Sequence, residues 1–340
     1  MSKNQFVDKL KEGDRVDTIL LVKASQLAET RAGKPYLRLT LADRSGEIQG
    51  PVWDRALELQ PVCAVGAFIH VIGQVQSYRD SLQLKIESVQ GRRKEEVNLA
   101  DFLVSCSGNR QQMADELQRL VLTLDNPWLK KLLNRFFKSD PCWSHFQEAP
   151  AAKSIHHAYV GGLLEHSLSV ARLADKLASH YPGVDRSLLL AGALLHDIGK
   201  LEELKMETAV IDYTVRGRLK GHLVIGSEMV GMEAAEIKDF PTELLEQLQH
   251  LILSHHGRQE FGSPTVPMTI EGFLLSFIDD LDAKMNLMEQ LRKKIDQPEM
   301  GWSDYQRSLE RFLYLGPLPA EDEKQEALDS STVQRQPTLF

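Results

Sequence analysis

A histidine and an aspartate stand side by side at the end of a long apolar segment. Residues 188–195 carry no charged or amide side chain, and His196, Asp197 and then Lys200 follow them. Burying such polar groups is costly unless something pairs with them. On a helix, neighbouring side chains point about 100° apart, but both can still reach one cation beside it. The pair alone is equally explained by a core helix with a hydrogen-bonded histidine and a capping aspartate.

Further histidines and aspartates occur at or near the ends of other segments whose apolar residues recur at helical spacing. His255 follows Leu251 and Ile252, which places it on the apolar face of its segment. Asp279 shares a face with Leu275 and Asp282, whereas Asp280 has Lys284 four residues on, a pairing typical of an exposed helix face. Five segments that each bring one or two such side chains to one point would form a metal site, and imidazole and carboxylate suit Mn, Fe, Zn or Ni. The candidate ligands are His166, His196, Asp197, His222, His255, His256 and Asp279.

The order of these residues resembles a known superfamily of enzymes. Histidine, His-Asp, histidine, His-His and aspartate occur in that sequence, and Gly199-Lys200 follows the His-Asp pair. This pattern is similar to that of the HD phosphohydrolases. The resemblance implies an all-α, metal-dependent hydrolase of phosphate esters.

Composition and charge limit the function further. The chain has 340 residues, 42% of them hydrophobic and 26% charged, which is typical of a soluble protein and leaves room for two domains. No apolar run approaches the roughly 18 residues of a membrane span, and the first residues have no signal-peptide core. Cys63, Cys106 and Cys142 match no zinc spacing, so we expect a reducing, cytoplasmic location. The net charge of −8 argues against a protein that grips duplex DNA through many phosphates.

The N-terminal part predicts a small β-barrel. After a lead over residues 1–13, residues 14–90 contain about five alternating apolar segments with a helical link near 55–59. This arrangement fits a five-stranded OB-fold and resembles the nucleic-acid-binding OB family. Such barrels stack bases of a single strand on aromatic side chains within a positive groove. The candidate contacts are Tyr36, Arg38, Trp53 and Tyr78, although Trp53 as a core residue and the arginine as a solvated one would explain the same pattern.

The remaining chain divides into a connector at 91–97, a helical linker region at 98–155, a domain at 156–315 and a disordered tail at 316–340. A segment with Lys153, His156 and His157 leads into His166. An OB-fold joined to an HD domain through this segment closely resembles the YhaM-type 3′-to-5′ exoribonucleases. The resemblance covers about residues 14–315.

This resemblance implies a metal-dependent 3′-to-5′ exoribonuclease that hydrolyses phosphodiester bonds through a two-metal site. One divalent cation would be held by His166, His196, Asp197 and Asp279, and the other by Asp197, His222 and His255. His256 would be a further ligand or a phosphate contact, and Lys200 would place its charge near the phosphate. Mn²⁺ is the first expectation, with Co²⁺, Fe²⁺ or Mg²⁺ as alternatives. Arg216, Arg218 and Lys220 would hold the strand.

Several alternatives stay open at this stage. Single-stranded DNA is an alternative to RNA, and a homo-oligomer an alternative to a monomer. A phosphohydrolase of small or cyclic nucleotides and a non-catalytic single-strand-binding protein are rival functions. Finally, Gln336, Leu339 and Phe340 resemble the short peptides by which bacterial proteins dock on the sliding clamp of DNA polymerase.

Overall fold

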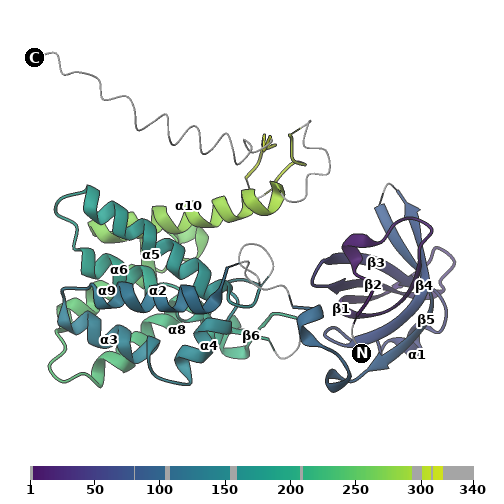
Figure 1. Ribbon diagram of the computed structural model, residues 1–340, viewed down its shortest axis with the longest axis horizontal. Coiled ribbons are helices and arrows are strands. Elements are labelled where there is room, and N and C mark those ends of the chain that lie inside the picture. The colour runs from purple at the N-terminus through teal and green to yellow at the C-terminus, as the bar shows by residue number, and fades with distance from the viewer. Residues whose placement is uncertain are drawn as a thin grey trace, which may run out of the picture. The chain divides into compact units, whose positions relative to one another are not determined.

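The structure, a computed structural model, describes residues 3–79, 81–103, 108–153, 159–206, 210–292, 301–307 and 309–316 (Figure 1). The chain divides into two compact units, Met1–Asp282 and Ala283–Phe340. The boundary between them falls within helix α10 (Ile270–Arg292). In the second unit, isolated bridges join Trp302 to Tyr314 and Gln306 to Arg311. All residues of the candidate site lie in the first unit. The predicted tail from residue 317 onward lies outside the described residues.

The N-terminal part of the first unit is a closed five-stranded barrel (Figure 1). Its strands are β1 (Arg15–Glu29), β2 (Pro35–Asp43), β3 (Gly46–Val52), β4 (Phe68–Tyr78) and β5 (Ser81–Arg92), in the order β1-β2-β3-β5-β4. All pairings are antiparallel except β3 with β5, where Gln49 lies opposite Gln83 and closes the barrel. Helix α1 (Ala56–Leu59) links β3 to β4, as the sequence predicts. The 3₁₀ turns η1 (Val7–Lys9), η2 (Lys94–Glu96) and η3 (Leu99–Asp101) precede and follow the barrel.

The barrel is filled by the inward-facing residues of its alternating strands. Leu37, Leu39 and Leu41 of β2 are fully buried, for example. Gly73 lies where the β4–β5 register shifts, and a Cβ atom there would stand 2.3 Å from the carbonyl oxygen of Lys85. Glycine at this position therefore permits the close approach of two strands at a bulge.

The second part of the chain is helical. Its helices are α2 (Arg110–Leu122), α3 (Pro127–Phe137), α4 (Cys142–Glu148), α5 (Gly162–His180), α6 (Arg186–Leu195), α7 (Lys200–Glu203), α8 (Val215–Ala235), α9 (Thr242–Ser254) and α10, with the 3₁₀ turn η4 (Gln259–Phe261). The predicted fold class, a five-stranded barrel followed by a helical domain, is confirmed. A small hairpin of β6 (Leu204–Lys205) and β7 (Asp212–Tyr213) departs from the all-α expectation.

Helix α6 lies at the centre of the helical core. Asp185 caps its N-terminus by accepting a hydrogen bond from the backbone N–H of Leu188, and the residues from Ser187 to Leu195 are all buried. Gly192 allows Leu251 of α9 to pack closely, because a Cβ at 192 would lie 2.5 Å from a Leu251 methyl carbon. The C-terminal end of α6 therefore carries His196 and Asp197 into the interior.

The turn after α6 approaches α8 closely. A Cβ atom at Gly199 would stand 2.1 Å from the carbonyl oxygen of His222 and 2.6 Å from the backbone nitrogen of Gly226. Any side chain at 199 would separate the two segments. This contact brings His222 of α8 next to the His196-Asp197 pair.

Among the described helices, none combines the length and the apolar character needed to cross a membrane.

Candidate metal centre

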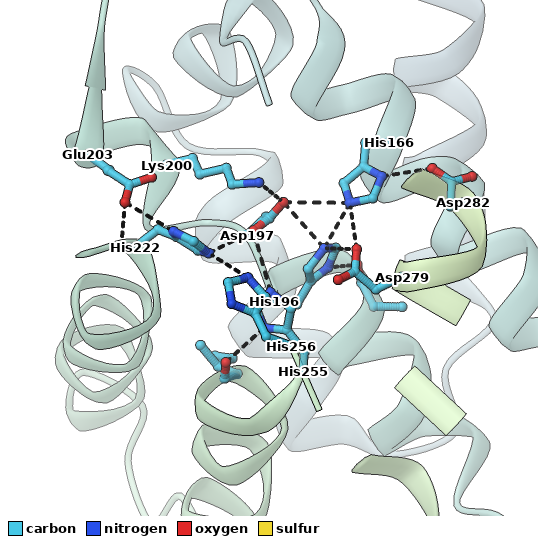
Figure 2. A network of polar contacts seen from close by, with 12 residues as sticks. His166, His196, Asp197, Lys200, Glu203, His222, His255, His256, Asp279 and Asp282 are labelled. Carbon is cyan, nitrogen blue, oxygen red and sulfur yellow. Dashed lines mark hydrogen bonds and ion pairs between the residues drawn. The ribbon is translucent and has the colours of Figure 1, made fainter. Parts of the chain in front are cut away.

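The structure brings all seven predicted ligands together in one place (Figure 2). They come from five segments: the first turns of α5, the residues after α6, α8, the residues after α9, and α10. The ligands form three overlapping groups, and within each group the ligand atoms lie within 4.8 Å of one another. The first group is His166, His196 and Asp197, the second is His196, His255 and Asp279, and the third is His222, His255 and His256. The middle of this group is shielded from solvent, since His196 is fully buried and Asp197 and His255 are each 1% exposed.

The Asp197 carboxylate lies among four imidazoles, each of which presents its Nε2 atom. Its Oδ2 atom is 3.4 Å from Nε2 of His196 and 3.6 Å from that of His166. Its Oδ1 atom is 3.5 Å from Nε2 of His222 and 3.7 Å from that of His255. Asp197 therefore connects the two groups of ligands that the sequence assigned to separate cations.

Three of the histidines are oriented by peptide carbonyls. The Nδ1 atoms of His196, His255 and His256 lie 2.9, 2.8 and 2.9 Å from the carbonyl oxygens of Ala193, Ile252 and Phe261. A carbonyl oxygen only accepts hydrogen bonds, so each Nδ1 must carry the proton. In the neutral ring this leaves the Nε2 lone pair directed into the centre, which is the arrangement typical of metal-bound histidine.

The other two histidines are oriented by carboxylates. Nδ1 of His166 is 2.8 Å from Oδ2 of Asp282, and the other oxygen of that carboxylate, Oδ1, accepts a hydrogen bond from the Ser169 hydroxyl. Oε1 of Glu203 accepts from the backbone N–H of His222 at 3.0 Å and lies 3.1 Å from Nδ1 of its ring. Sequence reasoning did not assign Glu203 or Asp282 to the site.

The donor set fits a divalent cation. Nε2 of His222 lies 3.3 Å from Nε2 of His256, and in the neutral rings both atoms carry lone pairs, because both Nδ1 atoms face acceptors. Oδ1 of Asp197 is buried without a hydrogen-bond partner. Lone pairs and an unpaired carboxylate oxygen at these distances repel one another unless positive charge lies between them. Imidazole nitrogens and carboxylate oxygens are the ligands that first-row divalent metals prefer.

The protonation states of the ligands also suit a metal. Burial by itself raises the pKa of the Asp197 carboxyl, but Lys200 and His196 hold that pKa well below its usual value. The pKa of Asp279 is likewise lowered by its histidine neighbours against the effect of burial. Burial lowers the pKa values of His255 and His256. At neutral pH both carboxyls are therefore ionised and these two imidazoles neutral, as ligands must be.

His166 behaves differently from the other ligands. Burial would lower the pKa of its imidazole, but hydrogen bonds to Asp279 and Asp282 raise that pKa to about 9. Its Nε2 lies 3.1 Å from Oδ1 of Asp279 and 3.1 Å from Nε2 of His196. In the absence of metal, a proton on His166 therefore supplies the positive charge between these groups.

Lys200 is part of the centre rather than a solvated cation at a helix end. Its Nζ atom donates to Oδ2 of Asp197 at 2.5 Å, and only 13% of its side chain is exposed. The lysine thus fixes one oxygen of the central carboxylate and leaves the other directed toward His222 and His255.

The predicted nucleic-acid contacts of the helical domain fall into two sets. Lys153 and Arg218 lie on the ring of Tyr213, each 5.4 Å from its centroid, and both form ion pairs with Asp212. Arg216 instead pairs with Glu202 and Glu228, and Lys220 pairs with Glu228. The charges of this second set are therefore largely cancelled by neighbouring carboxylates. His156 and His157 lie outside the described residues.

The predicted contacts of the barrel include two exposed aromatic positions. Tyr36 and Trp53 stack with ring centroids 4.6 Å apart at 22°, and Arg38 donates to the Tyr36 hydroxyl at 3.2 Å. Trp53 is 48% exposed, so the alternative of a core tryptophan is wrong. Tyr78 is 54% exposed, with the Arg79 guanidinium 5.3 Å from its ring centroid.

Comparisons with known proteins match both parts of the chain. The family model described as HD domain matches residues 163–284, and that described as OB-fold nucleic acid binding domain matches residues 18–90. Curated relatives named 3'-5' exoribonuclease YhaM match along most of their length. The protein from Bacillus subtilis is 38% identical to this chain, and the match covers 84% of this chain and 90% of that protein. The protein from Geobacillus sp. is 36% identical, with 84% of this chain and 88% of that protein covered. The protein from Listeria monocytogenes is 36% identical, with 83% of this chain and 89% of that protein covered.

Proposed function

This chain belongs to the YhaM family of 3′-5′ exoribonucleases, and from that premise we propose that it is a metal-dependent hydrolase that removes nucleotides from the 3′ end of single-stranded RNA. The observation that carries the proposal is the position of Asp197 among four inward-facing imidazoles. Hydrolysis of a phosphodiester requires positive charge at the phosphate and an activated water. Divalent cations supply both when bound at such a centre.

The residues divide between two cations as the family resemblance implies. His166, His196, Asp197 and Asp279 would hold one, and Asp197, His222 and His255 the other, with His256 as a further ligand of the second. The position of His256 supports this, because its Nε2 lies beside that of His222 rather than turned outward. We propose Mn²⁺ as the physiological metal, the first expectation from the family resemblance; the carboxylates of Asp197 and Asp279 suit it.

The chain's own side chains position the reacting groups. Lys200 holds Oδ2 of Asp197, and its charge lies close enough to the centre to act on phosphate oxygens as well. Asp282 and Glu203 fix the ring planes of His166 and His222. The buried setting excludes bulk water, so these electrostatic interactions are stronger than they would be at the surface.

The strand itself would be held at two places. On the barrel, Tyr36, Arg38, Trp53 and Tyr78 offer ring faces and a guanidinium to bases and phosphates. In the helical domain, the proposed contacts are Lys153, His156, His157, Arg216, Arg218 and Lys220. Of these, Lys153 and Arg218 are the best supported, because they lie on the ring of Tyr213 and share a single carboxylate, Asp212, between them. Single-stranded DNA would fit the same stacking contacts.

Helix α10 carries an exposed apolar stripe, which supports self-association. Phe273, Phe277, Leu281 and Met285 recur at every fourth residue and are each about half exposed or more. An antiparallel pairing of two α10 helices about Leu281 would bury these residues. Light scattering would report a dimer, and Phe277→Glu would yield a monomer. A monomer at every concentration of the unaltered protein would contradict this pairing.

Two further proposals concern the surroundings of the enzyme. We place it in the cytoplasm, where single-stranded RNA is available. We also propose that Gln336, Leu339 and Phe340, which lie outside the described residues, dock on the sliding clamp. A labelled peptide of residues 331–340 should bind the clamp with a Kd of roughly micromolar order, and a peptide with Leu339→Ala and Phe340→Ala should not. Equal binding by both peptides would end this idea.

The proposed activity is tested with labelled oligomers. RNA and DNA strands labelled at either end are incubated with the protein and Mn²⁺, Mg²⁺, Co²⁺ or no metal. We expect stepwise shortening of 5′-labelled RNA and early release of mononucleotide from 3′-labelled RNA, both dependent on metal. Turnover of free or cyclic nucleotides without shortening of RNA would favour a small-molecule phosphohydrolase, and metal-independent binding alone a non-catalytic protein.

A further inference from the structure

A short loop after α9 connects the metal centre directly to an exposed aromatic ring. The loop runs from His256 to Gly262, and glycines with φ of +77° and +95° stand at positions 257 and 262. Within it, the backbone N–H of Phe261 donates to Arg258 and that of Gly262 to Gln259, at 3.2 and 2.9 Å. These bonds form a compact turn with little freedom of its own.

The backbone of Phe261 is bonded to one of the candidate ligands. Its carbonyl oxygen accepts from Nδ1 of His256 at 2.9 Å, while Nε2 of the same ring lies 3.3 Å from Nε2 of His222. A single imidazole therefore separates this loop from the reaction centre. The backbone of Phe261 is thus held next to the candidate ligands.

The Phe261 side chain is not used by the fold. It is 64% exposed, and the Arg258 guanidinium lies 6.0 Å from its ring centroid. Single exposed apolar residues are ordinary on protein surfaces. This one differs because the ring and the guanidinium, the two groups that bind a base and its phosphate, are carried by a loop whose backbone is one hydrogen bond from a metal-ligand candidate.

We propose that Phe261 and Arg258 form a stacking subsite for the base of a nucleotide that flanks the scissile phosphodiester. The proposal rests on the function proposed above and assigns to it a specific recognition element. The ligand is a nucleobase of a single strand, and every base is accepted because each has a π-face. Arg258 contributes positive charge beside the ring, directed at the adjoining phosphate.

This subsite differs in its effect from the aromatic pair on the barrel. Tyr36 and Trp53 lie in the other domain, so they would act on long strands. Phe261 would act on the terminal nucleotides, whatever the length of the strand. The two contributions are separable by changing the substrate at its 3′ end only.

The test is a double-mutant cycle between the ring and the base. Short RNA strands are prepared with an intact 3′ end, with the terminal base removed, or with the base before it removed. kcat/KM is measured for each with the unaltered enzyme, Phe261→Ala and Phe261→Trp. The metal content of every enzyme is measured. We expect it to be equal, because the carbonyl that holds His256 belongs to the backbone and persists in every variant.

We expect removal of one of the two bases to lower kcat/KM of the unaltered enzyme about 5- to 150-fold, from the stacking energy of a single base. Phe261→Ala should lose a similar factor on intact RNA and be nearly indifferent to removal of that base. Phe261→Trp should retain the dependence on the base, and Arg258→Ala should weaken it.

The control is Tyr181→Ala. Tyr181 is 49% exposed and follows the C-terminal end of α5, so it is another exposed aromatic residue whose loss should leave the dependence on the base intact. If removal of the base lowered kcat/KM by the same factor in the unaltered enzyme and in Phe261→Ala, the subsite would be overturned, while the exonuclease proposal would still stand. Failure of the unaltered enzyme to shorten any RNA would instead refute the exonuclease proposal and the subsite with it.

Discussion

Replacing the carboxylate of Asp197 by an amide tests the metal centre most directly. Asp197→Asn keeps the shape of the side chain but removes the charge that faces four imidazoles at 3.4 to 3.7 Å. Since this carboxylate belongs to both ligand groups, both cations would be held less tightly. Activity on RNA should fall by at least about 10³-fold, because loss of one preorganised electrostatic contact already costs about 10²- to 10³-fold.

The same substitution has a measurable effect on thermal unfolding. A metal at 100 times its Kd adds about 2.7 kcal/mol to the free energy of unfolding, which raises the Tm of a domain of this size by about 5–11 °C. If the lost ligand raises Kd about 100-fold, the same metal concentration adds only about 0.4 kcal/mol, or roughly 1–2 °C. The difference in Tm with and without metal is the quantity to compare, since any change in metal-free stability cancels.

The assay combines thermal scans with and without Mn²⁺, metal analysis and RNA cleavage. The matched control is Asp280→Asn, the same chemical change beside Asp279 but at an exposed position of α10. The control should show the full metal-dependent rise in Tm and full activity. An equal rise in the Asp197 variant, or more than a few per cent of activity with a full metal complement, would refute the assignment.

Three further predictions concern the ligands and the barrel. Glu203→Gln should weaken metal binding by about 10- to 100-fold, as loss of a hydrogen-bond partner of a ligand does; an unchanged metal titration would show that His222 is oriented without the carboxylate. Because His166 has a pKa of about 9 and is protonated at pH 7, metal must displace that proton, so affinity should rise about tenfold per pH unit from pH 7 to 9 and then level off. Calorimetry in buffers of different ionisation enthalpy should detect about one proton released from His166, and a pH-independent affinity would contradict this. Replacing Tyr36 and Trp53 by alanine in the intact chain should raise KM for long RNA far more than for short RNA and leave kcat unchanged, and equal effects on both lengths would show that the barrel does not hold the strand.

The ligands were predictable because each one follows a helical apolar pattern. Leu251 and Ile252 placed His255 on a buried face, and the structure finds its Nε2 directed into the centre. Asp279, in contrast, lies in the middle of α10 rather than at or near the end of its segment. Periodicity reports which face of a helix is buried but not where along the helix the chain enters the core.

The partners of those ligands were not predictable. Asp282 is separated from His166 by 116 residues and Glu203 from His222 by 19, so no local pattern relates them. The same reason applies to Arg216, whose charge is offset by Glu202 and Glu228 in the folded chain. Basic residues before a ligand suggested a strand contact, but only tertiary structure shows which charges are already paired.

The two ways of holding the histidines have different evolutionary consequences. The acceptors of His196, His255 and His256 are peptide carbonyls, which no side-chain substitution can remove. Those three orientations are inherited with the backbone and can be lost only with the histidine itself. Glu203 and Asp282, which hold His222 and His166, can each become an amide through a single base change in the gene. Natural variation that retunes the metal preference, while sparing the ligands, is therefore expected to accumulate at these two carboxylates.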